Sequence, residues 1–255
     1  MIKRSIISAI TLVALSVFLI SYTQAQDSQA SKASKGISRE DIYAVLENDP
    51  ELLTEIIMEL VHNQQRDANA QILVDFDSYL KGDTKAGTLG NPDGDVVIVE
   101  FFDYRCGYCR RDHAMVKALL AKDDTIKLVL KQYPILDREG KEPLSALSAI
   151  VALYVTDQGK FEAFHEAMIA RPQPESRDDI FDVVEAIGLK RADAEQAIAD
   201  RYGIDRIQMN WALGEQLAIS GTPYYIIGSD FAEGAQKPEK FEALVKAARA
   251  EKTAK

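Results

Sequence analysis

The 255-residue chain contains two cysteines, Cys106 and Cys109, separated by only two residues. They follow an apolar, strand-like run over 96–102 and precede a helical pattern. A strand that ends in C-x-x-C at a helix start is typical of a thiol–disulfide redox site. The positive end of a helix favours the thiolate of the first cysteine, and thiolate is the reactive form. The motif Cys106-Gly107-Tyr108-Cys109 therefore predicts dithiol–disulfide exchange.

Zinc binding and an inert structural disulfide are the alternative uses of this cysteine pair. His113 follows Cys109 by four residues, so one helical face could carry both. Zinc sites take three or four protein ligands, however, and the three histidines of this chain are not clustered. A disulfide between residues this close closes a very small loop and adds little stability. The sequence favours the redox site, with no metal and no cofactor.

The first residues predict export. Lys3 and Arg4 precede an uncharged, mostly apolar run over 5–22, and small residues follow up to Ala25. This pattern predicts a signal peptide over 1–25, cleaved after about Ala25. A retained membrane anchor is the alternative, but the apolar run is short of the roughly 20 residues that a spanning helix needs. Export would place the thiols where disulfides form and persist.

The charge of the chain excludes some partners. It has 30 basic and 40 acidic residues, a net charge of −10. The signal segment removes two basic residues, so the mature chain carries 28 basic and 40 acidic residues and a net charge of −12. Such a balance argues against nucleic acid and against anionic membrane surfaces as partners. The length suits one large domain, or one medium domain with an appendage.

A flexible leader over 26–36 and a helical segment over 37–80 are expected before the cysteines. Ser38 with Asp41 resembles a capping box, and Pro50 is placed to open a second helix. The segment carries two apolar groups at helical spacing: Leu52, Leu53, Ile56, Ile57, Leu60 and Val61, then Ile72, Leu73, Phe76, Tyr79 and Leu80. Gly, Asp and Thr then predict a linker loop over 81–95.

The remainder, 96–252, alternates strand and helix patterns. Strands are expected at 96–102, 125–132 and 224–227, helices at 107–122 and 241–250, and a turn at 228–234. Apolar positions at helical spacing fill about 143–219. The order predicts an α/β domain with an all-helical insertion.

Three short motifs resemble the DsbA-like thioredoxin-fold proteins of bacterial cell envelopes. They are 99–105 leading into the cysteine motif, 131–134 and 221–223. With the insertion, this resemblance covers about 88–252 and implies a thioredoxin fold in the periplasm. Residues 47–53 are similar to the amino-terminal extension of the ScsC-like and Com1-like subgroup.

The resemblance implies a role for each residue of the motif. Cys106 would be the exposed nucleophile that forms a mixed disulfide with a client, and Cys109 the resolving thiol one turn deeper. Gly107 and Tyr108 would tune the thiolate of Cys106. Oxidases of the family often have Pro-His at these two positions, whereas Gly-Tyr matches the DsbC isomerases, which argues against a strongly oxidising role.

Pro223 matches the cis-proline of the thioredoxin fold; an ordinary trans proline is the alternative. The family's cis-proline packs beside the two sulfurs and pairs with an extended client strand. Thr222 is the residue that isomerases favour before it.

Glu100 is expected to be the family's buried acid, six residues before the nucleophile, where it would raise the pKa of Cys109 or relay its proton. The alternative is a strand-end glutamate that reaches water. Lys131 is a candidate partner for its charge. The arginines and histidines near the motif are expected to be solvated or structural: Arg105, Arg110, Arg111, His113 and His165.

The sequence thus predicts a periplasmic protein disulfide isomerase or reductase. Its partners would be cysteine-containing exported client proteins and a membrane redox partner. A DsbA-type oxidase, a chaperone and a copper-handling protein on the same fold are the alternatives. The apolar stripe of 37–80 must be buried, either against the domain or against copies of itself. The resemblance favours a homo-oligomer, a trimer or dimer.

Overall fold

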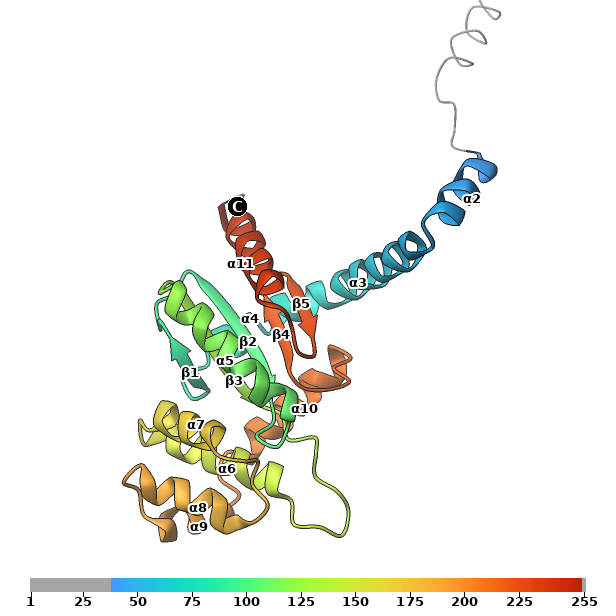
Figure 1. The fold of residues 1–255 in the computed structure, drawn as a ribbon. Helices are drawn as coiled ribbons and strands as arrows, with labels where there is room; N and C mark the ends of the chain where they lie inside the picture. Colours follow the sequence, from blue (N-terminus) through green and yellow to red (C-terminus); the bar gives the residue numbers. More distant parts are fainter. Residues whose placement is uncertain (1–37, 254–255) are drawn as a thin grey trace, which may run out of the picture. The chain divides into compact units, whose positions relative to one another are not determined.

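The computed structural model describes residues 38–253 (Figure 1). The predicted signal peptide, 1–25, and leader, 26–36, lie outside these residues. None of the described helices is both long and apolar enough to cross a membrane. The elements in chain order are α2 (Arg39–Asn48), α3 (Pro50–Asp75), α4 (Asp77–Lys81), β1 (Gly87–Gly90), β2 (Val96–Phe102), α5 (Gly107–Lys122), β3 (Ile126–Gln132), α6 (Leu144–Asp157), α7 (Phe161–Ala170), α8 (Arg177–Ala186), α9 (Arg191–Ala199), α10 (Ile204–Gln216), β4 (Tyr224–Ile227), β5 (Asp230–Glu233) and α11 (Pro238–Thr253).

The chain divides into two compact units between Val61 and His62. In the first unit, α2 begins at the predicted capping box: Ser38 Oγ accepts the Asp41 N–H at 3.1 Å, and Asp41 Oδ2 accepts the Ser38 N–H at 3.0 Å. The helix predicted to open at Pro50 is also confirmed. The large apolar side chains exposed in this unit are Ile42, Tyr43, Val45, Leu53, Ile56, Ile57, Met58, Leu60 and Val61.

The predicted end of the amino-terminal segment at residue 80 needs correction, because 62–80 belongs to the second unit. Leu80 is fully buried in a cluster with Val99 and Phe101 of β2. The rest of the second apolar group packs against the same cluster: Ile72, Leu73, Phe76 and Tyr79. Only the first apolar group of the predicted segment is therefore left outside the sheet-containing unit.

Two short strands lie where the sequence predicted a loop and a turn. The 81–95 segment contains β1, which pairs antiparallel with β3, and the 228–234 segment contains β5, which pairs antiparallel with β4. Gly87 is one of the residues whose type predicted a loop, but it lies in β1 and lets the ring of Phe161 pack against the strand. A Cβ at this position would lie 2.1 Å from that ring. Strands of four residues are too short to show a reliable alternating pattern.

Five strands form one mixed sheet in the order β1-β3-β2-β4-β5. β2 and β3 are parallel, and β4 is antiparallel to β2. All three were predicted as strands, β2 from its apolar run and β3 from its alternating pattern, and their residues are mostly buried, as expected for central strands covered on both faces. The predicted α/β class is confirmed.

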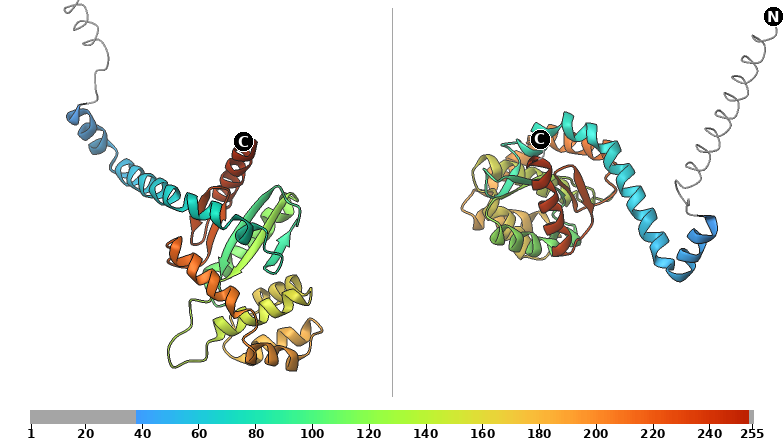
Figure 2. Two further views of the ribbon diagram at one scale, coloured as in Figure 1. Left: turned by 180° about the vertical axis from the view of Figure 1, so that it is seen from behind. Right: turned by 90° about the horizontal axis from the view of Figure 1, so that it is seen from above.

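Helices cover both faces of the sheet. α5 and α11 lie on one face, while α4 and α10 lie on the other, as the views from the front and from behind show (Figures 1 and 2). Alternate residues of β2 divide between them: Ile98 and Phe102 belong to the cluster beneath α5, and Val99 and Phe101 to the cluster on the opposite face. By this alternation Glu100 faces α5.

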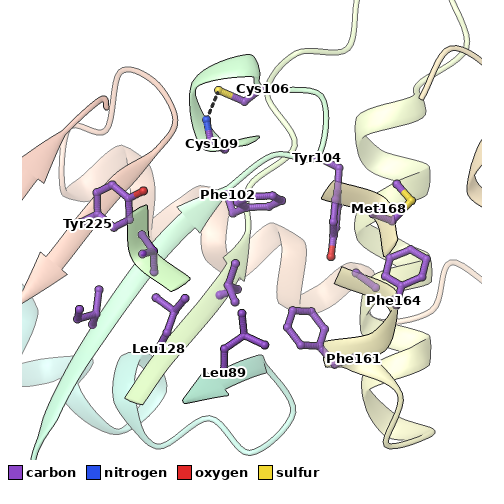
Figure 3. Close-up of a cluster of buried hydrophobic side chains, with 14 of the residues drawn as sticks. Leu89, Phe102, Tyr104, Cys106, Cys109, Leu128, Phe161, Phe164, Met168 and Tyr225 are labelled. Atoms are coloured by element: carbon purple, nitrogen blue, oxygen red, sulfur yellow. Dashed lines mark hydrogen bonds between the residues drawn. The ribbon is translucent and has the colours of Figure 1, made fainter. Parts of the chain in front are cut away.

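The chain between β3 and β4 forms the predicted helical insertion, α6 to α10. α6 to α9 pack on one another, and α6 and α7 also contact β1 (Figure 1). Aromatic side chains such as Phe161, Phe164 and Phe181 are buried there in the cluster that also contains the two cysteines (Figure 3). The insertion therefore shares its core with the helix that carries the motif.

Candidate active site

Cys106 is the N-cap residue of α5, and Gly107 begins the helix. Its Sγ accepts the Cys109 N–H at 3.5 Å (Figure 3), so the sulfur satisfies one of the free donors at the helix start. Both cysteines are free thiols. Cys106 is 6% exposed and Cys109 1%. The expected exposed nucleophile is thus largely buried, although it is the more accessible of the two thiols.

Asp103, which the sequence analysis did not single out, fixes the loop before the helix. Its Oδ1 accepts the Arg105 N–H at 2.8 Å, and its carbonyl accepts the Cys106 N–H at 3.0 Å. Its Oδ2 accepts the N–H groups of Ile135 and Leu136 at 2.9 and 3.1 Å. The contact between Asp103 Oδ1 and the Arg105 N–H belongs to a turn that aspartate side chains commonly form with the N–H two residues later. This turn could have been predicted from the sequence. The loop that carries Cys106 is thereby tied to the segment after β3.

The Thr222–Pro223 peptide bond is cis, as predicted, and its loop contacts the first sulfur. Cys106 Sγ donates to the Thr222 carbonyl at 3.1 Å. Thr222 Oγ1 is buried and has no hydrogen-bond partner within 38–253. Beside this loop lies a cavity of about 350 Å³, lined by Tyr108, Ser220, Gly221, Thr222, Tyr224, Glu233, Gly234 and Ala235.

The two thiols have opposite electrostatic environments. The pKa of Cys106 is lowered to about 6, mainly by the hydrogen bond from the Cys109 thiol and in part by the Thr222 side chain, against the opposing effect of burial. Burial raises the pKa of Cys109 far above its usual range, and the hydrogen bond to Cys106 and the charge of Glu100 add to this. At neutral pH, Cys106 is therefore mostly a thiolate and Cys109 a thiol.

Glu100 is 4% exposed, so it is a buried acid and does not reach water. Burial raises the pKa of Glu100 well above its usual range, and the charge of Asp112 raises it further, whereas the Tyr225 hydroxyl lowers it. The predicted pairing of Glu100 with Lys131 is wrong. Lys131 lies on the opposite face of the sheet, where its Nζ contacts Asp83 Oδ2 at 2.8 Å.

Arg110 was expected to be solvated, but it connects α5 to the helical insertion. Its guanidinium donates to the carbonyls of Tyr104, Ile169 and Arg171, at 3.3 Å for Tyr104 and 3.0 Å for Ile169. Arg111 instead lies over the ring of exposed Tyr108, 4.7 Å from its centroid. Arg110 is therefore a structural link between the active-site helix and the insertion.

The histidines are structural, as expected. His113 Nδ1 lies 3.3 Å from His165 Nε2, and His113 Nε2 lies 3.1 Å from Glu166 Oε1. Burial lowers the pKa of both rings, so they stay neutral at physiological pH. Within 38–253, no three His, Cys, Asp or Glu side chains are grouped so that they could hold a metal ion.

Comparisons with known proteins agree with this geometry. The family described as "DSBA-like thioredoxin domain" matches residues 97–246, more than half of the chain. A thioredoxin-like oxidoreductase from Silicibacter pomeroyi is 32% identical, with a TM-score of 0.63 over 68% of this chain and 97% of that one. The thiol-disulfide exchange protein alpha-DsbA2 from Wolbachia pipientis is 26% identical, with a TM-score of 0.60 over 74% and 97%. Proteus mirabilis ScsC in a transitional conformation shares the fold at 24% identity, with a TM-score of 0.59 over 89% and 99%.

Curated relatives match over part of their length. The Na⁺/H⁺ antiporter NhaA 3 of Salinispora tropica is 26% identical over 62% of this chain but only 24% of its own length. The thiol:disulfide interchange protein DsbC of Salmonella typhimurium is 28% identical over 60% of this chain and 52% of its own length. The chain thus spans a quarter to a half of these relatives. On the family match and the shared architecture, the chain belongs to the DSBA-like thioredoxin domain family and has a thioredoxin-like fold.

Proposed function

We propose that this chain is a periplasmic protein thiol–disulfide oxidoreductase that acts as a disulfide isomerase or reductase. The observation that carries the proposal is the opposite shift of two neighbouring thiols: the pKa of Cys106 falls to about 6, while that of Cys109 rises. Exchange needs one thiolate that attacks and a second thiol that stays protonated until it is needed. Its substrates would be cysteine-containing exported proteins, and a membrane redox partner would reset the cysteine pair.

The proposed reaction begins when the Cys106 thiolate attacks one sulfur of a client disulfide and the other client sulfur leaves as a thiolate. Cys109 can then attack Cys106 Sγ, which releases the client reduced. Alternatively, another thiol of the client attacks the client sulfur of the mixed disulfide. Cys106 then leaves as a thiolate, and the client keeps a rearranged disulfide. Each time the Cys106 thiolate returns, the Thr222 hydroxyl, which has no other hydrogen-bond partner among the described residues, can donate to it.

The Thr222–Pro223 loop is the proposed contact for the client backbone. Cys106 Sγ lies 3.1 Å from the Thr222 carbonyl oxygen, so a client disulfide at this sulfur would lie directly against the loop. The adjoining cavity, whose lining includes Tyr108 and Gly234, could hold the client side chains next to the cysteine. Pairing with an extended strand requires no particular client sequence, which suits an enzyme with many clients.

The choice between isomerase and oxidase depends on the redox potential. Gly107, Tyr108 and Thr222 support an isomerase or reductase, as does the partial match to DsbC. A Cys106 pKa of about 6 supports some oxidising power, since a stabilised thiolate stabilises the reduced form. It lies between the values of about 7 for thioredoxin and about 3.5 for DsbA. A DsbA-type oxidase is therefore the second candidate.

Three activity assays test this proposal on the mature protein: reactivation of scrambled ribonuclease, reduction of insulin, and oxidation of reduced ribonuclease. We expect reactivation and reduction to exceed oxidation, and all three to be lost in Cys106→Ser. Predominant oxidation would support the DsbA-type alternative. Client protection that survives Cys106→Ser would indicate a chaperone, and tight Cu(I) binding without exchange would indicate copper handling.

We also propose that the first unit mediates association into a trimer or dimer. It exposes a helical stripe that includes Leu53, Ile57 and Leu60, and such faces are normally covered. Light scattering on the mature protein should give a dimer or trimer. Leu53→Glu with Ile57→Glu should give a monomer that still reduces insulin, whereas Glu55→Gln on the same helix should change nothing. A monomeric wild-type protein would refute self-association.

A further inference from the structure

Asp112 is a buried carboxyl that the exchange steps above do not use. It lies one helical turn after Cys109 on α5 and is 4% exposed. Its Oδ2 accepts the Gln236 N–H at 3.0 Å and faces the Tyr225 hydroxyl at 3.5 Å. Burying a charged carboxyl costs free energy of folding unless the charge is stabilised or neutralised. A buried acid beside the redox pair therefore needs an explanation.

Tyr225 connects Asp112 to Glu100. The two strands β2 and β4 pair antiparallel with Glu100 directly opposite Tyr225, so both side chains lie on the face beneath α5. Figure 3 shows Tyr225 with its hydroxyl directed toward the side of Cys109. The ring is held edge-on against Phe241, with centroids 4.7 Å apart. The Tyr225 hydroxyl donates to Asp112 and also lowers the pKa of Glu100 by a hydrogen bond, so one hydroxyl acts on both buried carboxyls.

A tyrosine hydroxyl has a single proton to donate, so it can satisfy only one carboxylate at a time. The groups around Glu100 and Asp112 do not favour ionisation of both carboxyls. Glu100 is faced by Asp112, Cys106, Cys109 and Tyr104, and its β3 neighbour is the apolar Leu130.

Among the described residues, Arg111 is the cation whose charge lowers the pKa of Asp112. Burial raises the pKa of both carboxyls. A proton that either acid takes up can thus be shared with the other through the hydroxyl.

We propose that Asp112 is a positioning residue of the exchange reaction that acts through Tyr225 to set the protonation state of Glu100, the base for Cys109. This inference rests on the proposed function. In the mixed disulfide, the ionised Glu100 takes the Cys109 proton, and the Cys109 thiolate attacks Cys106 Sγ. The Cys106–Cys109 bond forms as the bond to the client breaks. Cys109 is oxidised, and the client sulfur is reduced and leaves as a thiolate that takes a proton from solvent.

The Tyr225 hydroxyl then completes the transfer. It accepts the proton from Glu100 while passing its own proton to Asp112, so the proton taken from Cys109 ends on Asp112 and Glu100 is ionised again. When the cysteine pair is next reduced, the same path in reverse returns this proton to the Cys109 thiolate. Tyr225→Phe, which removes only the hydroxyl, would leave the two acids unconnected.

The test uses rapid mixing of the reduced full-length mature protein with Ellman's reagent. The first equivalent of thionitrobenzoate reports attack by Cys106, and the second reports resolution by Cys109. The second phase is measured from pH 5 to 9 in wild type, Asp112→Asn, Asp112→Glu and Tyr225→Phe. Asp124→Asn, at an exposed carboxyl, is the control for loss of one surface charge.

We expect Asp112→Asn to move the midpoint of the second phase about one pH unit lower, the effect of removing a neighbouring like charge. Tyr225→Phe removes a donor to Glu100 and should move the midpoint higher, while Asp112→Glu and Asp124→Asn should match wild type. An unchanged midpoint in both Asp112→Asn and Tyr225→Phe, or a rate lowered equally at every pH, would overturn the proposal. Loss of the first phase would instead contradict the proposed function itself.

Discussion

Replacing Cys109 by alanine should raise the pKa of Cys106, because the Cys109 thiol is the largest contributor to its lowering. A hydrogen bond to a charged group is worth about 1.5–3 kcal/mol, and one pKa unit corresponds to about 1.4 kcal/mol. The expected rise is therefore about one to two units. At pH 6 about half of the wild-type Cys106 is thiolate, against roughly 1–9% in the variant after that rise.

Iodoacetamide labelling of Cys106, followed by mass spectrometry across pH 5 to 10, measures this change. Cys109→Ala should be labelled about 5- to 50-fold more slowly than wild type at pH 6 and equally fast at pH 10, given that rise in pKa. Cys109→Ser keeps a hydroxyl donor at the same position and should recover most of the wild-type rate at pH 6. Equal labelling of wild type and Cys109→Ala at pH 6 would refute the assignment of this hydrogen bond as the main cause.

Three further outcomes are expected elsewhere in the fold. Asp83→Ala leaves Lys131 buried without its carboxylate and should cost about 3 kcal/mol in urea unfolding at pH 7. Burial lowers the pKa of Lys131 to about 8 although Asp83 raises it, so without Asp83 the folded protein releases this proton at a lower pH than wild type does. The Asp83→Ala deficit should therefore shrink as pH rises toward about 8 and stay small above it, where Lys131 is neutral in both folded proteins. Gly214→Ala should cost about 1–3 kcal/mol, because its Cβ would lie 2.4 Å from the Tyr133 hydroxyl, whereas Gly221→Ala meets nothing and should be neutral in thermal unfolding. Equilibration with glutathione should place the cysteine couple between the potentials of thioredoxin and DsbA, roughly −270 to −120 mV, and Thr222→Val should shift it.

The features predicted from the sequence are those that a local pattern encodes. The central strands have apolar runs that reflect burial on both faces, and the cysteine spacing at a helix start leads directly to Cys106 as the N-cap. The cis bond before Pro223 came from the resemblance of a three-residue motif and is present. The apolar run of β2, together with the family resemblance, also predicted that Glu100 is buried, which the structure confirms.

The features that were missed depend on contacts distant in sequence. Lys131 was paired with the wrong acid, because the register of β2 against β3 places Leu130 beside Glu100 and turns Lys131 to the other face. Asp112 and Tyr225 are 113 residues apart, and nothing local links them. The predicted boundary at residue 80 was wrong, because the spacing of apolar residues along a helix does not indicate which surface buries them.

The central claim is that Cys106 attacks client disulfides and Cys109 resolves the product. It is tested most directly by trapping the mixed disulfide with scrambled ribonuclease in Cys109→Ala and in Cys106→Ala, followed by peptide mass spectrometry. The account predicts a stable adduct through Cys106 in Cys109→Ala and almost none in Cys106→Ala, where Cys109 is buried and protonated. An adduct that forms through Cys109, or none in either variant, would contradict it.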